Sequence, residues 1–341
     1  MPTLKEVARE ADVSLGTAYN VLSNARMVSP ALRRRVETAA RKLGYRPNHI
    51  ARSLRIRQTH TVGMIISDIT NPFFPEMVRG AEDAAMSRGY MLSTFNTDDR
   101  IEREQQVLEL LQSRRVDGLL VVPALPRGGH DHLRQAIEGG TPIVCLDRVP
   151  KELAVDSVTV ENEAGVQGAV EHLLAQGHTG IGFIGGRRDL LVSKERLKGF
   201  QRALAAQGIQ PVKEWVREGD FRPESGYTVA KQMLALPERP TALFVANILM
   251  TTGVLRAMED LGIESPRDLA VATFDHIALM DAFRPHLTSV VQPSYEIGKR
   301  GADLLIDRIE GKASASGPVH LRLKTELRVR DSTLLRGGAA G

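Results

Sequence analysis

The stretch Thr3-Leu4-Lys5-Glu6-Val7-Ala8-Arg9-Glu10-Ala11 carries a helix start signal followed by a helical repeat. Thr3 and Glu6 have the spacing of a capping box, in which the hydroxyl accepts from a backbone N–H three residues on and the carboxylate reaches back. The apolar side chains recur three and four residues apart and so share one helix face: Leu4, Val7, Ala8 and Ala11. The stretch predicts a short amphipathic helix.

Two more helices are predicted after it. Ser14 is a candidate N-cap, and Ser29-Pro30 is a third start signal because proline suits the first helical position. Gly44 is a candidate terminator of the third helix. The inward faces would carry Ala18, Val21 and Leu22, then Leu32, Val36, Ala39, Ala40 and Leu43. Three short helices with a tight first turn predict a helix-turn-helix head, although a plain three-helix bundle has the same pattern.

The charge distribution favours the helix-turn-helix. Residues 1–60 carry 12 Lys and Arg against 4 Asp and Glu, a net +8, whereas the whole chain carries 45 against 41, so the remainder is −4. The basic cluster on or beside the third helix comprises Arg33, Arg34, Arg35, Arg41, Lys42 and Arg46. Such an excess is typical of a surface that neutralises phosphates. The sequence therefore predicts a basic head that binds a polyanion, attached to an acidic body with another role.

The composition is that of a soluble globular protein. Its 341 residues are 42% hydrophobic and 25% charged, which fits about two domains with a packed core. We find no apolar run of about 18 residues and expect neither a membrane span nor, with charge from Lys5 on, a secretory signal. The single cysteine, Cys145, leaves no internal disulfide and fits a reducing cytoplasm.

From Thr61 the pattern changes to alternating strands and helices. Apolar runs predict strands at 62–66, 90–95, 118–122, 143–146, 181–184, 242–246 and 269–274. Helical segments are predicted at 75–88, 100–114, 131–138, 162–176, 193–207, 223–235 and 248–261. This alternation indicates parallel sheets covered on both faces. Because the rhythm restarts after residue 160, the body is predicted to be an α/β protein with two lobes around a cleft.

Several motifs suggest other chemistry but lack its context. Gly180 to Gly185 fits G-x-G-x-x-G, yet the glycines interleave with strand residues and no acid stands at 205. His130 and His132 have weak metal spacing without a third ligand, so a solvated loop is favoured, and His172 and His178 are interpreted as structural. We find no nucleophile elbow, phosphate loop or H-E-x-x-H. We therefore expect no metal, no cofactor and no enzymatic activity.

The motifs of the head are specific when taken together. Residues 3–11, Val13-Ser14-x-x-Thr17, Leu43-Gly44-Tyr45-Arg46-Pro47-Asn48 and Ala51-Arg52-Ser53-Leu54 resemble the lactose/galactose repressor (LacI–GalR) family of bacterial transcription regulators. The likeness covers essentially the whole chain. It implies a homodimeric, cytoplasmic, nucleoid-associated repressor that binds a near-palindromic double-stranded DNA operator under allosteric control by a small-molecule effector.

The resemblance also implies a division into domains. The helix-turn-helix head would span 1–46, the hinge helix and linker 47–60, and a two-lobed effector-binding and dimerisation domain of the type I periplasmic-binding-protein fold 61–341. The N-lobe would comprise about 61–160 and 292–320, and the C-lobe about 161–291 and 321–341. The chain would then cross between the lobes three times.

The family places the second helix of the head in the major groove. By position, the base-contacting residues would be Leu15, Gly16, Thr17, Tyr19 and Asn20, with further DNA contacts from Ser14, Arg26, Tyr45, His49, Leu54 and Arg55. Position 19 is commonly Ser and position 20 commonly Arg or His, so Tyr19 and Asn20 depart from the family. Because asparagine pairs with the adenine edge, we expect an A·T pair opposite Asn20, unless its amide contacts phosphate or water.

The hinge segment 46–55 is too short to hold a helix alone, because helix nucleation is unfavourable. The resemblance implies that two such hinge helices pair in the minor groove and that Leu54 wedges into a base step. The alternative is that Leu54 is a packing residue in a linker.

The resemblance assigns the effector to the cleft, at the carboxyl ends of the strands. The effector-binding residues carried over are Phe73, Phe74, Asp147, Leu190, Val192, Arg196, Phe221, Asn247 and Asp275. Arg196 and Asp275 would form a clamp, because a guanidinium offers forked donors and a carboxylate accepts. Phe73 and Phe74 would stack on a ring, although one of them could be core packing. Ile248 stands where the family usually has Asp, which predicts an unusually apolar lining.

These departures weaken the case for an ordinary hexose. They leave open a sugar or sugar derivative and, as an alternative, a non-sugar anionic or purine-like co-repressor; we hypothesise a small anionic or partly apolar metabolite. Two other functions are a solute-binding module without DNA binding, which residues 1–60 argue against, and an enzyme with a fused head such as a sugar kinase, for which no phosphate loop is found.

Overall fold

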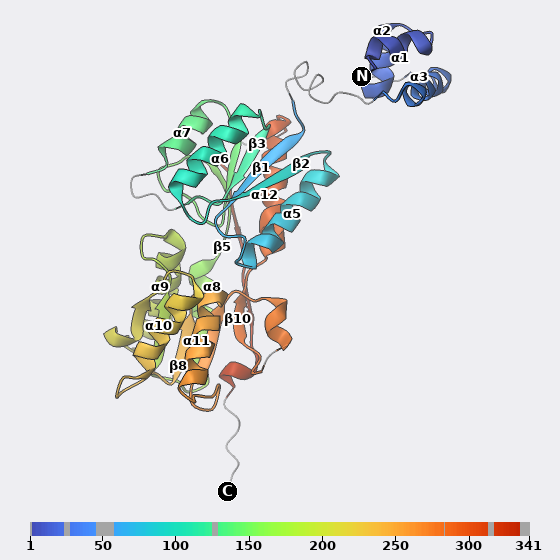
Figure 1. Ribbon diagram of the computed structural model, residues 1–341. Helices are drawn as coiled ribbons and strands as arrows, with labels where there is room; N and C mark the ends of the chain where they lie inside the picture. The colour runs from blue at the N-terminus through green and yellow to red at the C-terminus, as the bar shows by residue number, and fades with distance from the viewer. Residues whose placement is uncertain are drawn as a thin grey trace. The chain divides into compact units, whose positions relative to one another are not determined.

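The computed structural model describes residues 2–23, 28–45, 58–124, 129–282, 284–312 and 317–334. The chain separates into two compact units, Met1–Thr59 and His60–Gly341 (Figure 1). The predicted hinge helix falls in residues 46–57, outside the described residues.

The first unit holds the three predicted helices: α1 (Leu4–Glu10), α2 (Leu15–Ser23) and α3 (Pro30–Leu43). Their predicted start and stop signals are confirmed. The Thr3 backbone N–H donates to Glu6 at 2.7 Å, the Thr17 backbone N–H donates to Ser14 Oγ at 3.1 Å, and Gly44 ends α3 at φ 64°. The buried core of this unit comprises Val7, Ala8, Ala11, Ala18, Val21, Val36, Ala39 and Ala40.

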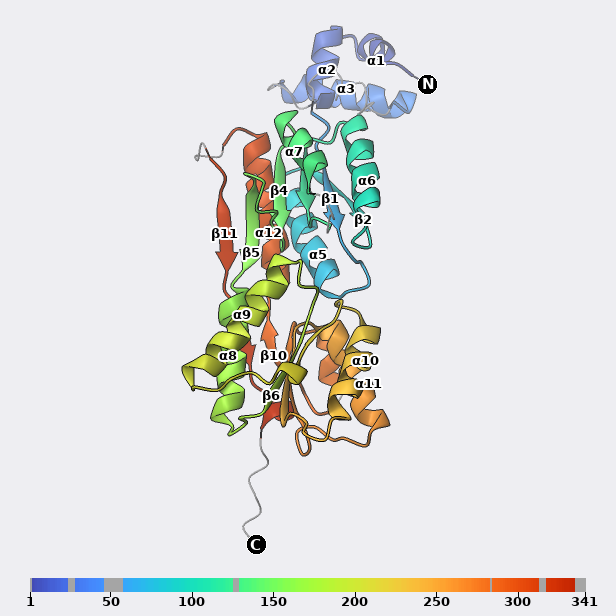
Figure 2. The same cartoon turned by 90° about the vertical axis from the view of Figure 1, so that its left-hand side faces the viewer.

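Within its described residues, the second unit forms two six-stranded sheets, each in its own lobe (Figures 1 and 2). The first sheet has the order β11-β5-β4-β3-β1-β2, and all its pairs are parallel. Its strands are β1 (Thr61–Ile66), β2 (Met91–Asn96), β3 (Gly118–Val121), β4 (Ile143–Leu146), β5 (Asp156–Val160) and β11 (His320–Leu323). Its helices are α5 (Phe73–Ser87), α6 (Ile101–Ser113), α7 (Asp131–Glu138) and α12 (Ser294–Ile309).

Alternate residues of β1 face opposite sides of this sheet, as the two-residue period of a strand requires. Met64 and Ile66 pack in the core with α5 and α12, whereas Ile65 packs with α6 and α7. Both faces are therefore covered, which is why the strand is a continuous apolar run.

The second sheet has the order β12-β10-β9-β8-β6-β7, parallel except for the antiparallel pair β10–β12. Its strands are β6 (Ile181–Gly185), β7 (Val216–Glu218), β8 (Ala242–Val245), β9 (Ala270–Phe274), β10 (Thr288–Val291) and β12 (Glu326–Arg328). Its α-helices are α8 (Asn162–Ala175), α9 (Leu191–Ala206), α10 (Pro223–Leu234) and α11 (Ile248–Asp260), and the short 3-10 helices are η1 (Lys213–Trp215), η2 (Ala278–Ala282) and η3 (Asp331–Thr333).

The chain passes between the sheets after β5, after β10 and between β11 and β12. The predicted fold class of a helix-turn-helix head followed by a two-lobed α/β body is confirmed. Gly182 lies inside β6, where an added Cβ would stand 2.6 Å from Leu243 Cδ2. This glycine serves strand packing, in agreement with the rejection of a dinucleotide fingerprint.

One sequence expectation is wrong. His130 and His132 do not lie in a solvated loop, because His130 is buried and His132 half-buried against acidic side chains at the start of α7. His130 Nδ1 lies 2.8 Å from Glu152 Oε1 and its Nε2 lies 3.0 Å from the Ala124 carbonyl oxygen. His132 Nε2 lies 2.6 Å from the fully buried Glu104. Both histidines anchor α7 in the first lobe.

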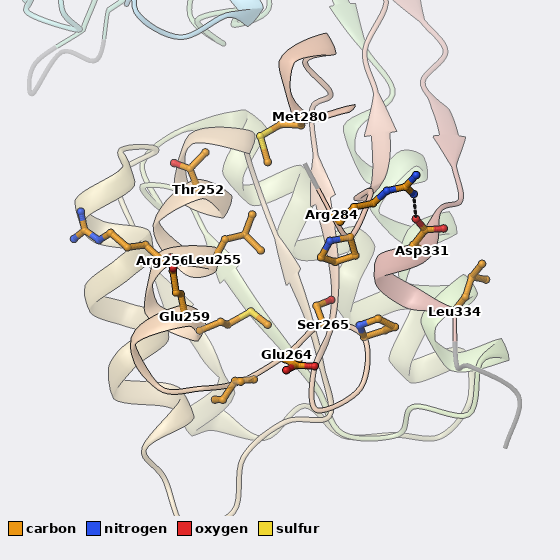
Figure 3. Close-up of a pocket in the computed structure, with 14 residues that line it drawn as sticks. Thr252, Leu255, Arg256, Glu259, Glu264, Ser265, Met280, Arg284, Asp331 and Leu334 are labelled. Carbon is orange, nitrogen blue, oxygen red and sulfur yellow. Dashed lines mark hydrogen bonds and ion pairs between the residues drawn. The ribbon is translucent and has the colours of Figure 1, made fainter. Parts of the chain in front are cut away.

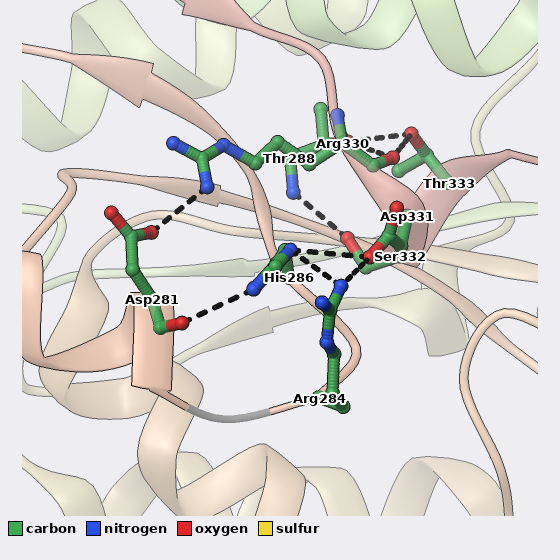
Figure 4. Close-up of polar contacts among 8 residues, drawn as sticks. All are labelled: Asp281, Arg284, His286, Thr288, Arg330, Asp331, Ser332 and Thr333. Carbon is green, nitrogen blue, oxygen red and sulfur yellow. Dashed lines mark hydrogen bonds and ion pairs between the residues drawn. The ribbon is translucent and has the colours of Figure 1, made fainter.

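The end of the described chain is fixed to the second sheet by hydroxyl groups (Figure 4). Ser332 Oγ donates to the Val271 carbonyl at 2.6 Å and accepts from the Thr288 backbone N–H at 2.8 Å. Thr333 Oγ1 lies 2.7 Å from Thr288 Oγ1 and 2.8 Å from His172 Nε2. His172 is therefore a structural residue, as predicted.

Candidate functional site

The first candidate site is the exposed face of α2. Leu15 is 52% exposed and Gly16 is also exposed, whereas Thr17, Tyr19 and Asn20 are half-buried. A helix that presents small and polar side chains beside a basic surface can enter a major groove and contact base edges. The predicted contacts Arg26, His49, Leu54 and Arg55 lie outside the described residues.

Two predicted DNA contacts have structural tasks as well. Ser14 Oγ accepts from the Thr17 backbone N–H and lies 2.9 Å from Thr17 Oγ1, so it caps α2 and orients the Thr17 hydroxyl. Tyr45 packs against the core of the head, and its backbone N–H donates to the Ala40 carbonyl at 2.9 Å.

The basic cluster of the head is partly occupied by internal pairs. Arg35 Nη2 donates to the carbonyls of Ala11 and Asp12 at 2.7 and 2.9 Å and to the Asp12 carboxylate at 3.2 Å. Lys42 Nζ donates to Glu10 at 2.6 Å. Arg35 and Lys42 thus hold α3 to the end of α1. Only the other residues of the basic cluster are then expected to bind DNA phosphates. Within the described residues, Arg34 and Arg41 form no ion pair.

The second candidate site is a cavity between the two lobes of the body, here called the cleft cavity. Its lining comprises Ser67, Asp68, Asn71, Phe73, Phe74, Asp99, Asp147, Arg148, Val192, Arg196, Asp220, Phe221, Arg222, Asn247, Asp275 and Gln292. The structure therefore brings together all the predicted effector residues except Leu190. Leu190 is buried at the start of α9 and lines a neighbouring cavity of about 290 Å³ instead.

The cleft cavity lies at the carboxyl ends of the strands, and its backbone is strained there. Asp147, which follows β4, has φ 62°, and Asp275, which follows β9, has φ 74°. Phe221, beyond β7, has φ 68°, which is unusual for a bulky side chain. Such conformations persist only where the surroundings hold them, and they concentrate at binding sites.

The surroundings of Phe221 show how it is held. Asn247 Nδ2 donates to the Phe221 carbonyl at 3.0 Å, while Asn247 Oδ1 accepts from the Met250 backbone N–H and caps α11. An added Cβ at Gly186 would lie 2.0 Å from the Phe221 ring, so only glycine leaves room for the ring. Asn247 therefore positions the aromatic wall of the cavity.

Arg196 crosses the floor of the cavity and is 4% exposed. Its Nε donates to Asn162 Oδ1 at 2.9 Å, its Nη1 donates to the Ala246 carbonyl at 2.6 Å, and its Cζ lies 3.7 Å from the centre of the Phe274 ring. These contacts fix the guanidinium plane without a direct ion pair to Asp275. Arg196 and Asp275, the predicted clamp, line one cavity, but each is held by its own hydrogen bonds and not by the other.

Gly199 brings α9 close to α8. An added Cβ at Gly199 would lie 2.3 Å from the Glu163 carbonyl oxygen. This close approach sets Arg196 beside Asn162 at the start of α8.

The carboxylates of the cavity are buried but supplied with donors. Burial raises the pKa of Asp275, and the positive charge of Arg196 opposes the rise. Gln292 Nε2 donates to Asp275 Oδ1 at 2.5 Å, and the Ile248 backbone N–H also donates to this carboxylate. Burial likewise raises the pKa of Asp147, against the charges of Arg148 and Arg196. In its ionised form, each carboxylate is a strong acceptor for hydroxyl donors.

Three buried polar atoms on the lining have no hydrogen-bond partner: Ser67 Oγ, Arg148 Nε and Gln292 Oε1. A ligand that offers both donors and acceptors would satisfy them. Arg148 is oriented by Asp99, whose Oδ1 accepts from Arg148 Nη1 at 2.5 Å.

The lining corrects the predicted apolar character of the cavity. Five aspartates and three arginines line it: Asp68, Asp99, Asp147, Asp220, Asp275, Arg148, Arg196 and Arg222. Asp99 and Gln292 were not predicted from the sequence. Asp99 follows β2 and Gln292 follows β10, and the ends of strands are where ligand sites of such folds lie.

A larger groove of about 1400 Å³ lies elsewhere on the second lobe (Figure 3). It is lined by α11, η2 and the segments before β9 and β10, including Leu255, Met280 and Pro285. These segments precede their strands, so the groove lies at the amino ends of the second sheet. Effectors of open α/β folds bind at the opposite, carboxyl ends.

Comparison with known proteins agrees with the head and the two-lobed body. Residues 3–48 match the family model "Bacterial regulatory proteins, lacI family", and residues 170–333 match "Periplasmic binding protein-like domain". The chain is 37% identical over 311 residues to the ribose operon repressor of Escherichia coli, covering 91% of this chain and 93% of the relative. It is 35% identical over 314 residues to the HTH-type transcriptional repressor PurR of Aliivibrio salmonicida, covering 92% and 93%.

Solved structures agree as well. The lac repressor dimer bound to operator and the anti-inducer ONPF has a TM-score of 0.86 at 29% identity, covering 98% of this chain and 99% of that one. A LacI family transcriptional regulator from Enterococcus faecium with bound ribose has a TM-score of 0.72 at 28% identity, covering 80% and 98%.

The head and the cleft cavity together define a DNA-binding transcriptional regulator with a periplasmic-binding-protein-like ligand domain. The chain belongs to the lacI family of bacterial regulatory proteins. Among the described residues, no helix is both long and apolar enough to cross a membrane.

Proposed function

We propose that this regulator is a homodimeric repressor whose effector is a neutral monosaccharide of pentose size, such as D-ribose, bound in the cleft cavity. The observation that carries the proposal is the charged and aromatic lining at the strand ends. Buried aspartates accept from hydroxyls, arginines donate to them, and Phe73 with Phe74 offers an apolar wall to one face of the sugar ring.

The size of the cavity supports a single sugar ring. Its volume is about 50 Å³, and because one water occupies about 10–15 Å³ on this measure, it holds about four waters. The E. coli relative is named a ribose operon repressor, and the E. faecium structure contains ribose.

The charge of the lining argues against an anionic effector, because the aspartates outnumber the arginines. It also argues against a purine-like co-repressor, since a purine base offers fewer donors to these carboxylates than a sugar with a hydroxyl on nearly every carbon. Because the A. salmonicida relative is named PurR, purines are the ligands that the test compares with D-ribose.

We further propose that the protein acts in the cytoplasm by binding DNA and effector, without catalysing a reaction. Its operator would have two half-sites that match the two-fold symmetry of a dimer. The relatives named above are repressors, and the lac repressor structure is a dimer on its operator. The α2 face with Tyr19 and Asn20 would contact the bases of each half-site.

Isothermal titration calorimetry tests the effector class. We expect D-ribose to bind the purified protein, whereas guanine, hypoxanthine and D-gluconate do not. Arg196→Met, which removes the floor guanidinium while keeping an unbranched side chain, should abolish binding of D-ribose. Binding of a purine, with no heat from D-ribose, would overturn the proposal.

A further inference from the structure

Glu195 on α9 connects the cleft cavity to the opposite lobe. One of its carboxylate oxygens, Oε2, accepts from Asn162 Nδ2 at 3.1 Å. The other, Oε1, accepts from Arg322 Nη2. Glu195 is absent from the cavity lining, yet it is one residue away from Arg196, which forms the floor of the cavity.

The contact with Asn162 bears on effector binding. Asn162 is 1% exposed, and its Oδ1 accepts from Arg196 Nε at 2.9 Å. An amide presents a donor on one side and an acceptor on the other. Because the Glu195 carboxylate can only accept, it turns Nδ2 of Asn162 toward itself and Oδ1 toward Arg196. The flipped amide would set two donors, Nδ2 and Arg196 Nε, against each other.

The contact with Arg322 spans the lobes. Arg322 lies on β11 of the first sheet, and its Nε also donates to the Val160 carbonyl at the end of β5. Both strands end where the chain crosses to the second lobe, whereas Glu195 lies on a helix of the second lobe. The ion pair therefore bridges the lobes beside two of the three crossings.

We propose that Glu195 is a positioning residue for the effector: it fixes the Asn162 amide that orients Arg196, and through Arg322 it ties this arrangement to the first lobe. The proposal rests on the proposed function, since it gives the effector-binding arginine a link to lobe orientation. A ligand that displaces Arg196 would strain the link between the lobes, which is how a binding event can shift a population of lobe arrangements.

A matched control exists on the same helix. Arg202 pairs with Glu163 inside the second lobe, with side-chain exposures of 61% and 22%, close to the 52% and 20% of Arg322 and Glu195. Arg322→Ala and Arg202→Ala each remove one partly exposed ion pair, but only the first removes a pair that joins the lobes.

The test measures D-ribose affinity by calorimetry and backbone hydrogen exchange without ligand. Glu195→Ala should weaken D-ribose about tenfold, because it frees the amide that orients a charged group. Glu195→Gln keeps an acceptor for Asn162, so it should stay within about threefold of wild type. Arg322→Ala should speed exchange at the ends of β5 and β11, and Arg202→Ala should not.

The outcomes separate the two proposals. If wild type does not bind D-ribose, the proposed effector is wrong, and the exchange comparison in the ligand-free protein still decides whether the inter-lobe link exists. Equal exchange in Arg322→Ala and Arg202→Ala would overturn the link. Equal loss of affinity in Glu195→Gln and Glu195→Ala, with unchanged melting temperatures, would overturn the positioning role.

Discussion

Asp275→Asn should weaken effector binding while leaving the ligand-free protein at least as stable as wild type at pH 7. The carboxylate of Asp275 is 5% exposed and accepts from Gln292 and from the Ile248 backbone N–H. Asparagine has the same size and tolerates the positive φ of this position. It replaces one acceptor by an NH2 group, whichever way the amide turns.

The magnitude follows from the lost acceptor. A hydrogen bond to a charged group contributes about 1.5–3 kcal/mol, so one lost bond weakens D-ribose about 10- to 150-fold. The expected effect on the stability of the ligand-free protein is in the opposite, favourable direction. Because burial raises the pKa of Asp275 in the folded state, its ionised form opposes folding. This penalty sets in as pH rises above the unfolded pKa of about 3.9 and is complete once pH has risen through the folded pKa. Asparagine is neutral at every pH, so the variant does not carry this penalty.

Calorimetry with D-ribose and thermal unfolding of the ligand-free protein at pH 7 measure both effects in one variant. Asp220→Asn is the control, since it removes the same charge from an exposed position of the lining and should change affinity far less. If Asp275→Asn binds D-ribose within twofold of wild type, the assignment of Asp275 as a buried acceptor for the sugar is refuted.

Four further outcomes are expected. Asn20→Arg should change the half-site selected from random DNA from A·T to G·C at one position, and an unchanged site would contradict base contact by Asn20. Arg34→Ala should reduce the salt dependence of operator binding by about one ion, whereas Arg35→Ala, which breaks three contacts within the head, should chiefly lower the melting temperature of the head. Ser332→Ala should destabilise the protein by about 1–3 kcal/mol in urea unfolding, because a buried donor and a buried carbonyl lose their partner. Burial lowers the pKa of His172, so its contribution to stability is present above the unfolded pKa of about 6.5 and lost as pH falls through the folded pKa. In urea unfolding, the free energy of unfolding should therefore differ less between pH 7.5 and pH 5.5 in His172→Gln than in wild type.

Local signals accounted for the elements of the fold. The capping box at Thr3 and Glu6, the serine caps and Gly44 act within a few residues, so the head helices could be predicted from the sequence alone. The apolar strand runs were equally local. The family resemblance then supplied the cleft residues, because their motifs occupy fixed places after the strands.

Long-range contacts could not be predicted in this way. Asp99 and Arg148 meet across the cavity from loops that are 49 residues apart, and Arg35 reaches the end of α1 from α3. The buried partner of His132, Glu104, lies on a different helix. A sequence pattern gives no sign of such pairs, since it records which residues are polar but not which of them the topology brings together.

We propose that a neutral monosaccharide in the cleft cavity controls the affinity of the head for DNA. Fluorescence anisotropy on an operator selected from random DNA, titrated with D-ribose, measures this control. Saturating D-ribose should change operator affinity at least tenfold in wild type and leave the operator affinity of Arg196→Met unchanged. Operator affinity that does not respond to D-ribose, but responds to guanine or hypoxanthine, would contradict it.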